Sequence, residues 1–402
     1  MSGAMAPERR DVVIVGGGPA GAATAIRLAR LGHDVLVLER SPAWRWRACG
    51  VFTSPATVAA LRRLGVADVD LATLARRVPA MRVETATGTR FRLTYGDDGS
   101  LARAPVGFDR SALDPHLLAL AATAGAEVRP GTTVRAVRDG RVTTADESSI
   151  QARVIVGADG LRSVVARDAG VDRPPPLGER PALTFHVEDP RPDGVRDARM
   201  IVFDGGYVGL APVPGGRVNV GIVLADGRWR RRLRAEGAGS VAAAVMRAIP
   251  PADDDPVPWA APRICDELEG ASPVGTRVTR RAGADWLLVG DAAGFLDPFT
   301  GEGLHRALRS AALAAEVLDD HLRGRSGALA AYDRALTRRT RSKDMVSLLV
   351  QAFLAVPPAF DYAARRLAAR PGVRETMGLV MGDLVPASSA FDPRFLAGLL
   401  RP

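Results

Sequence analysis

The chain has 402 residues, of which 47% are hydrophobic and 25% are charged. This composition is ordinary for a globular protein of two or three domains, and it excludes a wholly disordered chain, a collagen-like chain and a small disulfide-stapled fold. The net charge of +9 comes almost entirely from arginine. Together with abundant Ala, Gly and Pro, this bias is typical of a GC-rich genome, so it does not indicate nucleic-acid binding.

Two local arginine clusters, at residues 228–234 and 338–341, are interpreted as solvated faces. Docking of an acidic protein partner, such as a carrier or a reductase, is the alternative. No apolar run is long enough for a transmembrane helix, and the short polar N-terminus is unlike a signal peptide, so we expect a cytoplasmic protein. Cys49 and Cys265 are far apart, and the histidines lack the spacing of zinc ligands, so we expect neither a disulfide nor a metal site.

The first strong pattern is a strand, turn, helix and strand near the N-terminus. Residues 11–15 form a short β-branched run, residues 22–31 have helical character, and residues 35–38 form a second apolar run that closes on Glu39. A glycine-rich turn joins the first strand to the helix. This order is typical of the first half of a dinucleotide-binding fold.

The turn itself matches G-x-G-x-x-G through Gly16, Gly18 and Gly21. In that motif the first glycine permits the tight turn, the second lets the backbone approach a pyrophosphate, and the third lets the helix pack closely on the strand. The helix N-terminus offers free N–H groups to the phosphates. Glu39 stands near the position where an acid accepts a ribose hydroxyl, so dinucleotide binding is predicted.

The middle of the chain predicts a strand pair, a helix and a hairpin, in that order. The strand pair is expected at 78–84 and 89–94, the helix at 109–124, and the hairpin at 132–138 and 141–144 across Asp139-Gly140. After a proline-rich linker at 173–180, residues 181–225 predict strands and 228–249 a helix.

Two further segments combine a strand with a glycine and an aspartate. Residues 150–170 predict a strand that runs into Gly157-Ala158-Asp159-Gly160 and then a helix with Ser163. Residues 286–306 predict another strand, then Gly290-Asp291, a loop, and Gly301-Glu302-Gly303 at the start of a long helix.

These three segments together resemble the FAD-dependent oxidoreductases of the p-hydroxybenzoate hydroxylase fold, over about residues 10 to 340. Within that fold the chain is most similar to the geranylgeranyl reductase family. The likeness to this branch rests on the stretch Trp46-Arg47-Ala48-Cys49-Gly50-Val51-Phe52-Thr53-Ser54-Pro55, ahead of a helix that ends at Leu64-Gly65, and on the G-E-G turn.

The resemblance implies an α/β fold with a Rossmann-type FAD-binding domain, an inserted β-sheet substrate domain and a helical C-terminal cap. We expect the FAD-binding domain at 1–75, 100–171 and 276–340. We expect the substrate domain at 76–99 and 172–275, and the helical region, broken at Pro357, Pro371 and Pro386, at 341–402.

The resemblance also implies particular contacts with FAD. Asp159 would lie near the pyrophosphate, and Asp291 would bind the ribityl chain or the pyrophosphate. Gly301 and Gly303 would point backbone N–H groups and a helix dipole at flavin N1 and O2, where reduced flavin is negatively charged. Further contacts are expected from Arg110 near the phosphates, from the backbone at Ala136 and Val137 around the adenine, and from Arg40, Arg45 and Arg47.

The chain departs from the family in the strand that would line the substrate site. The family has Y-x-W-x-F-P there, whereas this chain has Tyr207-Val208-Gly209-Leu210-Ala211-Pro212. Both inner aromatics have become small, so Tyr207, Gly209 and Ala211 are predicted to line a widened surface. We therefore expect a bulky hydrophobic substrate, polyketide-like or terpenoid-like.

Few residues offer acid–base chemistry near the flavin. Cys49 is a candidate proton donor or nucleophile, with a small packing residue as the alternative. His305 is a second candidate, with a helix-surface histidine as the alternative. No second glycine-rich unit is present, so electrons are expected from a transiently docked NAD(P)H, from a partner reductase or from the substrate itself.

Three functions remain open at this point. The missing inner aromatics favour a monooxygenase, or hydroxylase, of secondary metabolism. The branch resemblance favours reduction of a C=C bond, with Cys49 as the proton donor. A non-redox protein with a structural FAD is the third reading.

Overall fold

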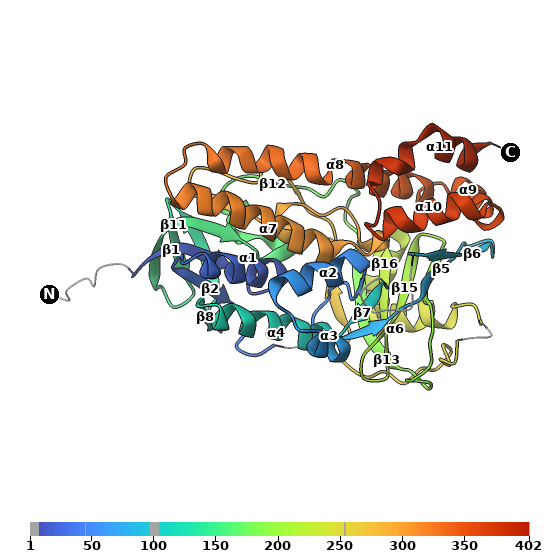
Figure 1. Ribbon diagram of the computed structural model, residues 1–402. Coiled ribbons are helices and arrows are strands. Elements are labelled where there is room, and N and C mark those ends of the chain that lie inside the picture. The colour runs from blue at the N-terminus through green and yellow to red at the C-terminus, as the bar shows by residue number, and fades with distance from the viewer. Residues whose placement is uncertain (1–7, 45, 97–103, 253–254, 402) are drawn as a thin grey trace.

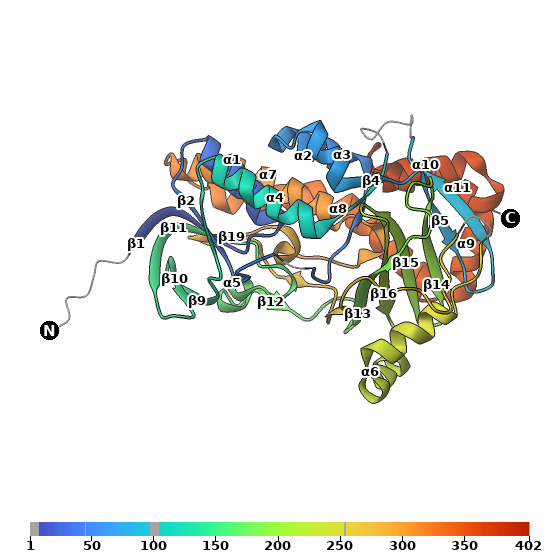
Figure 2. The same cartoon turned by 90° about the horizontal axis from the view of Figure 1, so that it is seen from below.

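The computed structural model describes residues 8–44, 46–96, 104–252 and 255–401. One sheet stands at the end of the molecule where the described chain begins, and a second sheet stands at the other end beneath the C-terminal helices (Figure 1). Long helices run between the two ends along one side (Figure 2).

The first sheet carries the predicted dinucleotide-binding unit. Its seven strands run in the order β8-β2-β1-β11-β10-β9, with β19 also paired to β11. β1 lies parallel to both β2 and β11, and Val15 is opposite Leu38 on one side and Gly157 on the other. The bounds are β1 Glu8–Val15, β2 Val35–Glu39, β8 Glu127–Pro130, β9 Val134–Arg138, β10 Arg141–Thr144, β11 Ser149–Gly157 and β19 Trp286–Leu288.

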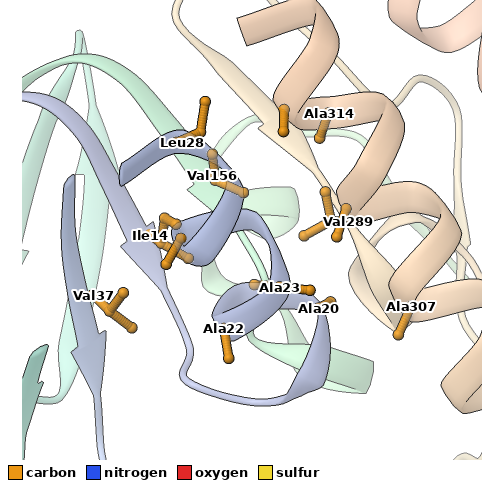
Figure 3. Close-up of a cluster of buried hydrophobic side chains, with 14 of the residues drawn as sticks. Ile14, Ala20, Ala22, Ala23, Leu28, Val37, Val156, Val289, Ala307 and Ala314 are labelled. Carbon is orange, nitrogen blue, oxygen red and sulfur yellow. The ribbon is translucent and has the colours of Figure 1, made fainter. Parts of the chain in front are cut away.

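Helices cover this sheet because its central strands are buried on both faces, as is typical of parallel sheets. Small side chains of α1, such as Ala20 and Ala23, let this helix lie close to α7, which contributes Ala307 and Ala314 (Figure 3). The helices around this sheet are α1 Pro19–Arg30, α4 Arg110–Thr123, α5 Val164–Asp168, α7 Gly303–Leu322 and the first part of α8 Ala328–Leu354.

The second sheet also has seven strands, in the order β17-β13-β16-β15-β14-β5-β6. Tyr207 and Ala211 of β15 lie in the cluster beneath the C-terminal helices, whereas Val208 and Leu210 pack toward α6, as the alternation of a strand requires. The bounds are β5 Ala80–Glu84, β6 Arg90–Thr94, β13 Ala182–Glu188, β14 Ala198–Phe203, β15 Gly206–Val213, β16 Arg217–Leu224, β17 Glu269–Ala271 and α6 Gly227–Arg247, which is broken at Gly237.

A small third sheet joins the two larger ones and was not predicted. Its order is β3-β7-β4, and each strand has only two or three residues, too few to give an alternating pattern. The elements around it are β3 Phe52–Thr53, α2 Pro55–Leu64, α3 Asp68–Leu74, β4 Ala75–Arg77 and β7 Val106–Phe108. The remaining short elements are β12 Asp172–Arg173, β18 Arg277–Val278 and the 3-10 turns at 160–162, 290–293, 298–300 and 387–391.

The C-terminal region is helical, as predicted, and comprises the end of α8, α9 Pro357–Ala369, α10 Pro371–Met381 and α11 Pro393–Leu400. Prolines stand at the first turn of the last three helices, where a missing N–H costs nothing. Two of the expected domain limits cut through elements: α8 is continuous across residues 340–341, and β4 is continuous across 75–76. No single helix in the described ranges is long and apolar enough to span a membrane, although α8 and α9 pass that test as a bent pair.

Candidate functional site

The glycine turn forms an open cradle at the start of α1. A Cβ on Gly16, whose φ is +102°, would lie 2.5 Å from the Ala158 carbonyl oxygen, and a Cβ on Gly21 would lie 2.0 Å from the Gly16 carbonyl oxygen. A Cβ on Gly18 would meet no atom within 4 Å. Gly16 and Gly21 therefore serve the fold, while Gly18 leaves space in front of the helix N-terminus, whose cap residue supplies no side-chain hydrogen bond. This geometry fits a pyrophosphate.

Glu39 lies beside the cradle and is already engaged. Its Oε2 accepts a hydrogen bond from the Gly17 N–H at 2.8 Å, and its Oε1 accepts from the Ser41 N–H at 2.9 Å and from Arg47 at 2.7 Å. Burial by itself would raise the pKa of the Glu39 carboxyl, but these donors outweigh it and hold the pKa below its usual value. Glu39 is thus a charged acceptor that also shapes the turn.

The arginines near Glu39 differ in their surroundings. Arg47 turns its guanidinium toward Glu39 and Ser41 and stacks over the Trp44 ring at 4.4 Å. Arg40 is exposed and has no hydrogen bond or ion pair among the described side chains. Arg45 lies outside the described residues. A phosphate contact from any of them stays a prediction.

Two aspartates present oxygens that lack a donor. Asp159 accepts from the Val164 N–H at 2.6 Å through Oδ2, while its buried Oδ1 has no partner. Asp291 is half-buried, and its carboxylate has no hydrogen bond to any residue that the structure describes. Burial raises the pKa of both carboxyls. Buried polar atoms are nearly always paired, so these oxygens fit the hydroxyl groups of a ligand such as the ribityl chain.

The G-E-G turn has the geometry that the resemblance implied. Gly301 has φ +68°, and a Cβ there would lie 2.8 Å from the Phe52 ring. α7 begins at Gly303, and its cap residue Glu302 makes no side-chain capping bond. The first N–H groups of a 20-residue helix are therefore free of a side-chain cap, as a site for negative charge requires.

Two predicted contacts are occupied by protein groups. The Val137 N–H donates to Asp168 at 2.9 Å, which leaves the Val137 carbonyl and side chain for an adenine. Arg110 is buried, forms a bidentate pair with Asp114 at 2.7 and 2.8 Å, and donates to the Gly50 carbonyl at 2.8 Å. Both FAD contacts stay predictions, and the observed role of Arg110 is to fix the residue after Cys49.

The segment that carries Cys49 is held between the two sheets. Besides the Arg110 contact with Gly50, Trp46 packs edge-on against His186 of β13, with 4.3 Å between ring centroids. Burial raises the pKa of the Cys49 thiol to about 11, and the nearby Arg110 only partly offsets it. The thiol is therefore neutral at physiological pH, so it is suited to donate a proton and poorly suited to act as a thiolate nucleophile.

The predicted substrate strand shares its face with a buried polar network. Tyr207 donates to Asp297 at 2.6 Å. Asp297 also accepts from Gln351 of α8 at 2.8 Å, from the Phe299 N–H at 2.9 Å and from Arg180 at 3.1 Å. Burial, and then Asp297, raise the pKa of the Tyr207 phenol well above its usual value. Residues from four distant segments thus fix the loop before the G-E-G turn.

Aromatic rings that β15 lacks are supplied from the other side of this site. Phe299 packs edge-on against Tyr207 at 5.0 Å, and Phe360 of α9 packs on Phe299 at 6.3 Å. Gly209 faces the same side, since a Cβ there would lie 3.4 Å from Met200 Cε. Phe299 and Phe360 were missed because nothing in their local sequence marks them as partners of Tyr207.

His305 lies inside the protein, so its surface alternative is wrong. It is 7% exposed, its Nδ1 has no partner, and burial lowers its pKa to about 4. Beside it lies Lys343, the only lysine in the chain, which donates to Asp383 at 2.8 Å and to the Val380 carbonyl at 2.7 Å. Its Nζ is also 3.5 Å from an unpartnered oxygen of Glu302. A lone lysine in an arginine-rich chain was the one available signal for this cluster.

A larger cavity of about 390 Å³ lies elsewhere, between α6 and the other face of the second sheet. Its lining includes Val208, Trp229 and Val245. Because Val208 and Tyr207 point to opposite faces of β15, this cavity is separate from the Tyr207 side.

Comparisons with known proteins agree with this geometry. A family model described as an FAD binding domain matches residues 9–347. The chain is 29% identical to a menaquinone reductase of Mycolicibacterium smegmatis, over 95% of this chain and 93% of that protein. It is 31% identical to a menaquinone reductase of Mycobacterium tuberculosis, over 77% and 76%, and 30% identical to digeranylgeranylglycerophospholipid reductase 1 of Methanopyrus kandleri, over 76% and 80%.

Solved structures share the fold. A geranylgeranyl bacteriochlorophyll reductase-like protein from Thermoplasma acidophilum has a TM-score of 0.77 at 22% identity and covers 98% of this chain and 99% of its own. A probable FAD-dependent monooxygenase from Pseudomonas aeruginosa has a TM-score of 0.71 at 22% identity and covers 88% and 99%. The fold is thus found in proteins named for both kinds of chemistry.

Proposed function

Because this chain belongs to the FAD-binding-domain family of FAD-dependent oxidoreductases, we propose that it reduces a C=C bond in a bulky, prenyl-bearing hydrophobic molecule. When bound, FAD supplies the hydride for such a reaction. The protein must then hold the double bond, exclude water and provide one proton.

The observation that carries this proposal is the state of Cys49. A desolvated, neutral thiol in a clamped segment is a proton source that does not ionise at working pH. In the balanced reaction one alkene carbon gains the hydride, the other gains the thiol proton, and solvent reprotonates the sulfur. Asp291 and the Arg110–Asp114 pair lie near the thiol and set its electrostatic surroundings. The electrons come from NAD(P)H or a partner reductase.

The substrate class rests on the lining residues and on the names of the relatives. Tyr207, Gly209 and Ala211 on one side, and Phe299 and Phe360 on the other, offer apolar surface with one polar network at Asp297. The three curated relatives are named as reductases of menaquinone or of a digeranylgeranyl phospholipid. In this proposal the second sheet is the substrate-binding part of the molecule.

A monooxygenase acting on a polyketide-like or terpenoid-like molecule of secondary metabolism is the second candidate. The observation that favours it is the replacement of the family's inner aromatics by Gly209 and Ala211. The sequence alone led us to prefer this function. The names of the curated relatives, which all describe reductases, are the reason that reduction now stands first.

Product analysis with and without oxygen tests the proposal. FAD-loaded protein, reduced with excess dithionite in an anaerobic chamber, is incubated with a prenylated naphthoquinone and the product is analysed by mass spectrometry. We expect a product that has gained two hydrogen atoms in the side chain without oxygen. A product that appears only in air and carries one added oxygen atom would refute the reductase and support the monooxygenase.

A further inference from the structure

One side of α8 is exposed along most of its length. Arg334, Arg338, Arg341, Met345, Leu348, Ala352 and Ala355 recur at alternating spacings of four and three residues, and every one of them is exposed. This spacing places all of them on one face of a helix. We call this face the α8 stripe.

The α8 stripe has a basic half followed by an apolar half. Arg334, Arg338 and Arg341 have no hydrogen bond or ion pair to any described residue, so their charges are uncompensated. Met345 and Leu348 are 45% and 43% exposed. The apolar half continues past the helix end into Val356, which is 52% exposed, and two exposed prolines.

The opposite face of the same helix is committed to the interior. Val346, Ser347 and Gln351 are buried, and Gln351 holds Asp297. In Figure 1, α8 is the outermost element above α7, and no described element lies over its outer side. At 1.5 Å per residue, the stripe is about 33 Å long. It is therefore an extended surface on a rigidly held helix.

We propose that the α8 stripe docks on the surface of an anionic phospholipid bilayer. The unpaired arginines meet lipid phosphates, and Met345, Leu348 and the turn at Val356 enter the acyl boundary. A helix with a basic and an apolar section is suited to such an interface, where each basic residue adds to binding. This inference concerns a surface and does not depend on the proposed reaction.

The order of the two halves disfavours a second copy of this chain as the occupant. Two copies with parallel α8 helices would place arginines against arginines. Two copies with antiparallel helices would place each basic half against an apolar half. A bilayer suits both halves at once, because its headgroups and acyl chains lie within a few ångströms of each other in depth.

The surface also lies close to the aromatic side of the candidate site. The turn after α8 leads directly into α9, where Phe360 packs on Phe299 beside Tyr207. Docking at Val356 would therefore bring a lipid phase next to the hydrophobic cluster that Phe360 joins.

Vesicle flotation of the FAD-loaded protein tests the proposal. Vesicles rich in phosphatidylglycerol are compared with vesicles of phosphatidylcholine alone, without substrate, at low and high salt. We expect binding to the anionic vesicles that weakens as salt rises, and a fall of at least about tenfold in R338E/R341E, since each basic residue near an anionic surface contributes several-fold. Met345→Gln with Leu348→Gln should also weaken binding, and should do so at every salt concentration.

Matched controls use the other arginine cluster and another exposed apolar residue. Arg231 and Arg234 of α6 have the same spacing, are exposed and have no described partner, but α6 packs on the opposite face of the second sheet (Figure 2). R231E/R234E and Val195→Gln should leave flotation unchanged, and all variants should keep the FAD spectrum and melting temperature of the wild type.

Three outcomes would overturn the proposal. The first is equal loss of binding in R231E/R234E and R338E/R341E, which would show attraction by net charge alone. The second is wild-type binding in R338E/R341E. The third is sedimentation of the wild type as a dimer that R338E/R341E dissociates, which would assign the stripe to a second copy.

Discussion

Replacing Gly18 by valine should remove FAD while leaving the fold intact. The backbone at Gly18 has φ −67° and ψ −179°, an extended conformation that valine adopts readily, and a Cβ there meets nothing within 4 Å. The expected loss of stability is that of a poorer N-cap, at most about 1 kcal/mol, or roughly 2 °C in melting temperature for a chain of this size.

The same side chain would stand in the space that a pyrophosphate needs. We expect the Kd for FAD to rise by at least about 100-fold, which corresponds to about 2.8 kcal/mol. Apoprotein is titrated with FAD by flavin fluorescence, and its melting temperature is measured in parallel. Gly372→Val is the control, because Gly372 of α10 also has open space around its Cβ but is remote from the cradle. A Gly18→Val protein that purifies yellow and fully loaded would refute the assignment of the cradle.

Three other substitutions test the remaining parts of the site. Cys49→Ala should lower turnover by about 10²–10⁴ while the donor still reduces the flavin, as expected for a lost general acid; turnover within a few-fold of wild type would leave Cys49 a packing role. Gly209→Trp should block turnover with FAD still bound, because the new ring would fill the space beside Met200; normal turnover of large substrates would remove this strand from the substrate site. Lys343→Met should cost about 3–5 kcal/mol in urea unfolding at neutral pH, because it strands the buried Asp383 carboxylate. Burial opposes ionisation of Asp383, and Lys343 and the other donors nonetheless hold its pKa below the usual value; in the variant the pKa should rise, so the stability gap from wild type should narrow as pH falls toward about 4. A gap that is independent of pH would contradict this pairing.

The parts of the site that follow from local chemistry were predicted from the sequence. Gly16, Gly18 and Gly21 announce the cradle because a tight turn, an open approach and a close helix contact each exclude a side chain. The hairpin at Asp139-Gly140 was predicted for a similar reason, since both residues have positive φ, as its turn requires.

The parts that depend on tertiary contacts were not predicted. Asp297 gathers Tyr207, Arg180 and Gln351 from segments that lie up to 171 residues apart, and no periodicity links them. His305 was weighed as a surface residue because its position on α7 gave no sign that α8 and the loop after α10 would cover it. The third sheet was missed because its strands are too short to form a pattern.

The most direct test of the central claim is the reoxidation of the reduced, FAD-loaded protein by a prenylated naphthoquinone under argon. The protein is photoreduced, mixed with substrate in a stopped-flow cell, and followed by the visible absorbance of oxidised flavin. We expect the absorbance to return without oxygen, in a rapid phase that Cys49→Ala slows. A flavin that stays reduced until air is admitted would contradict the account.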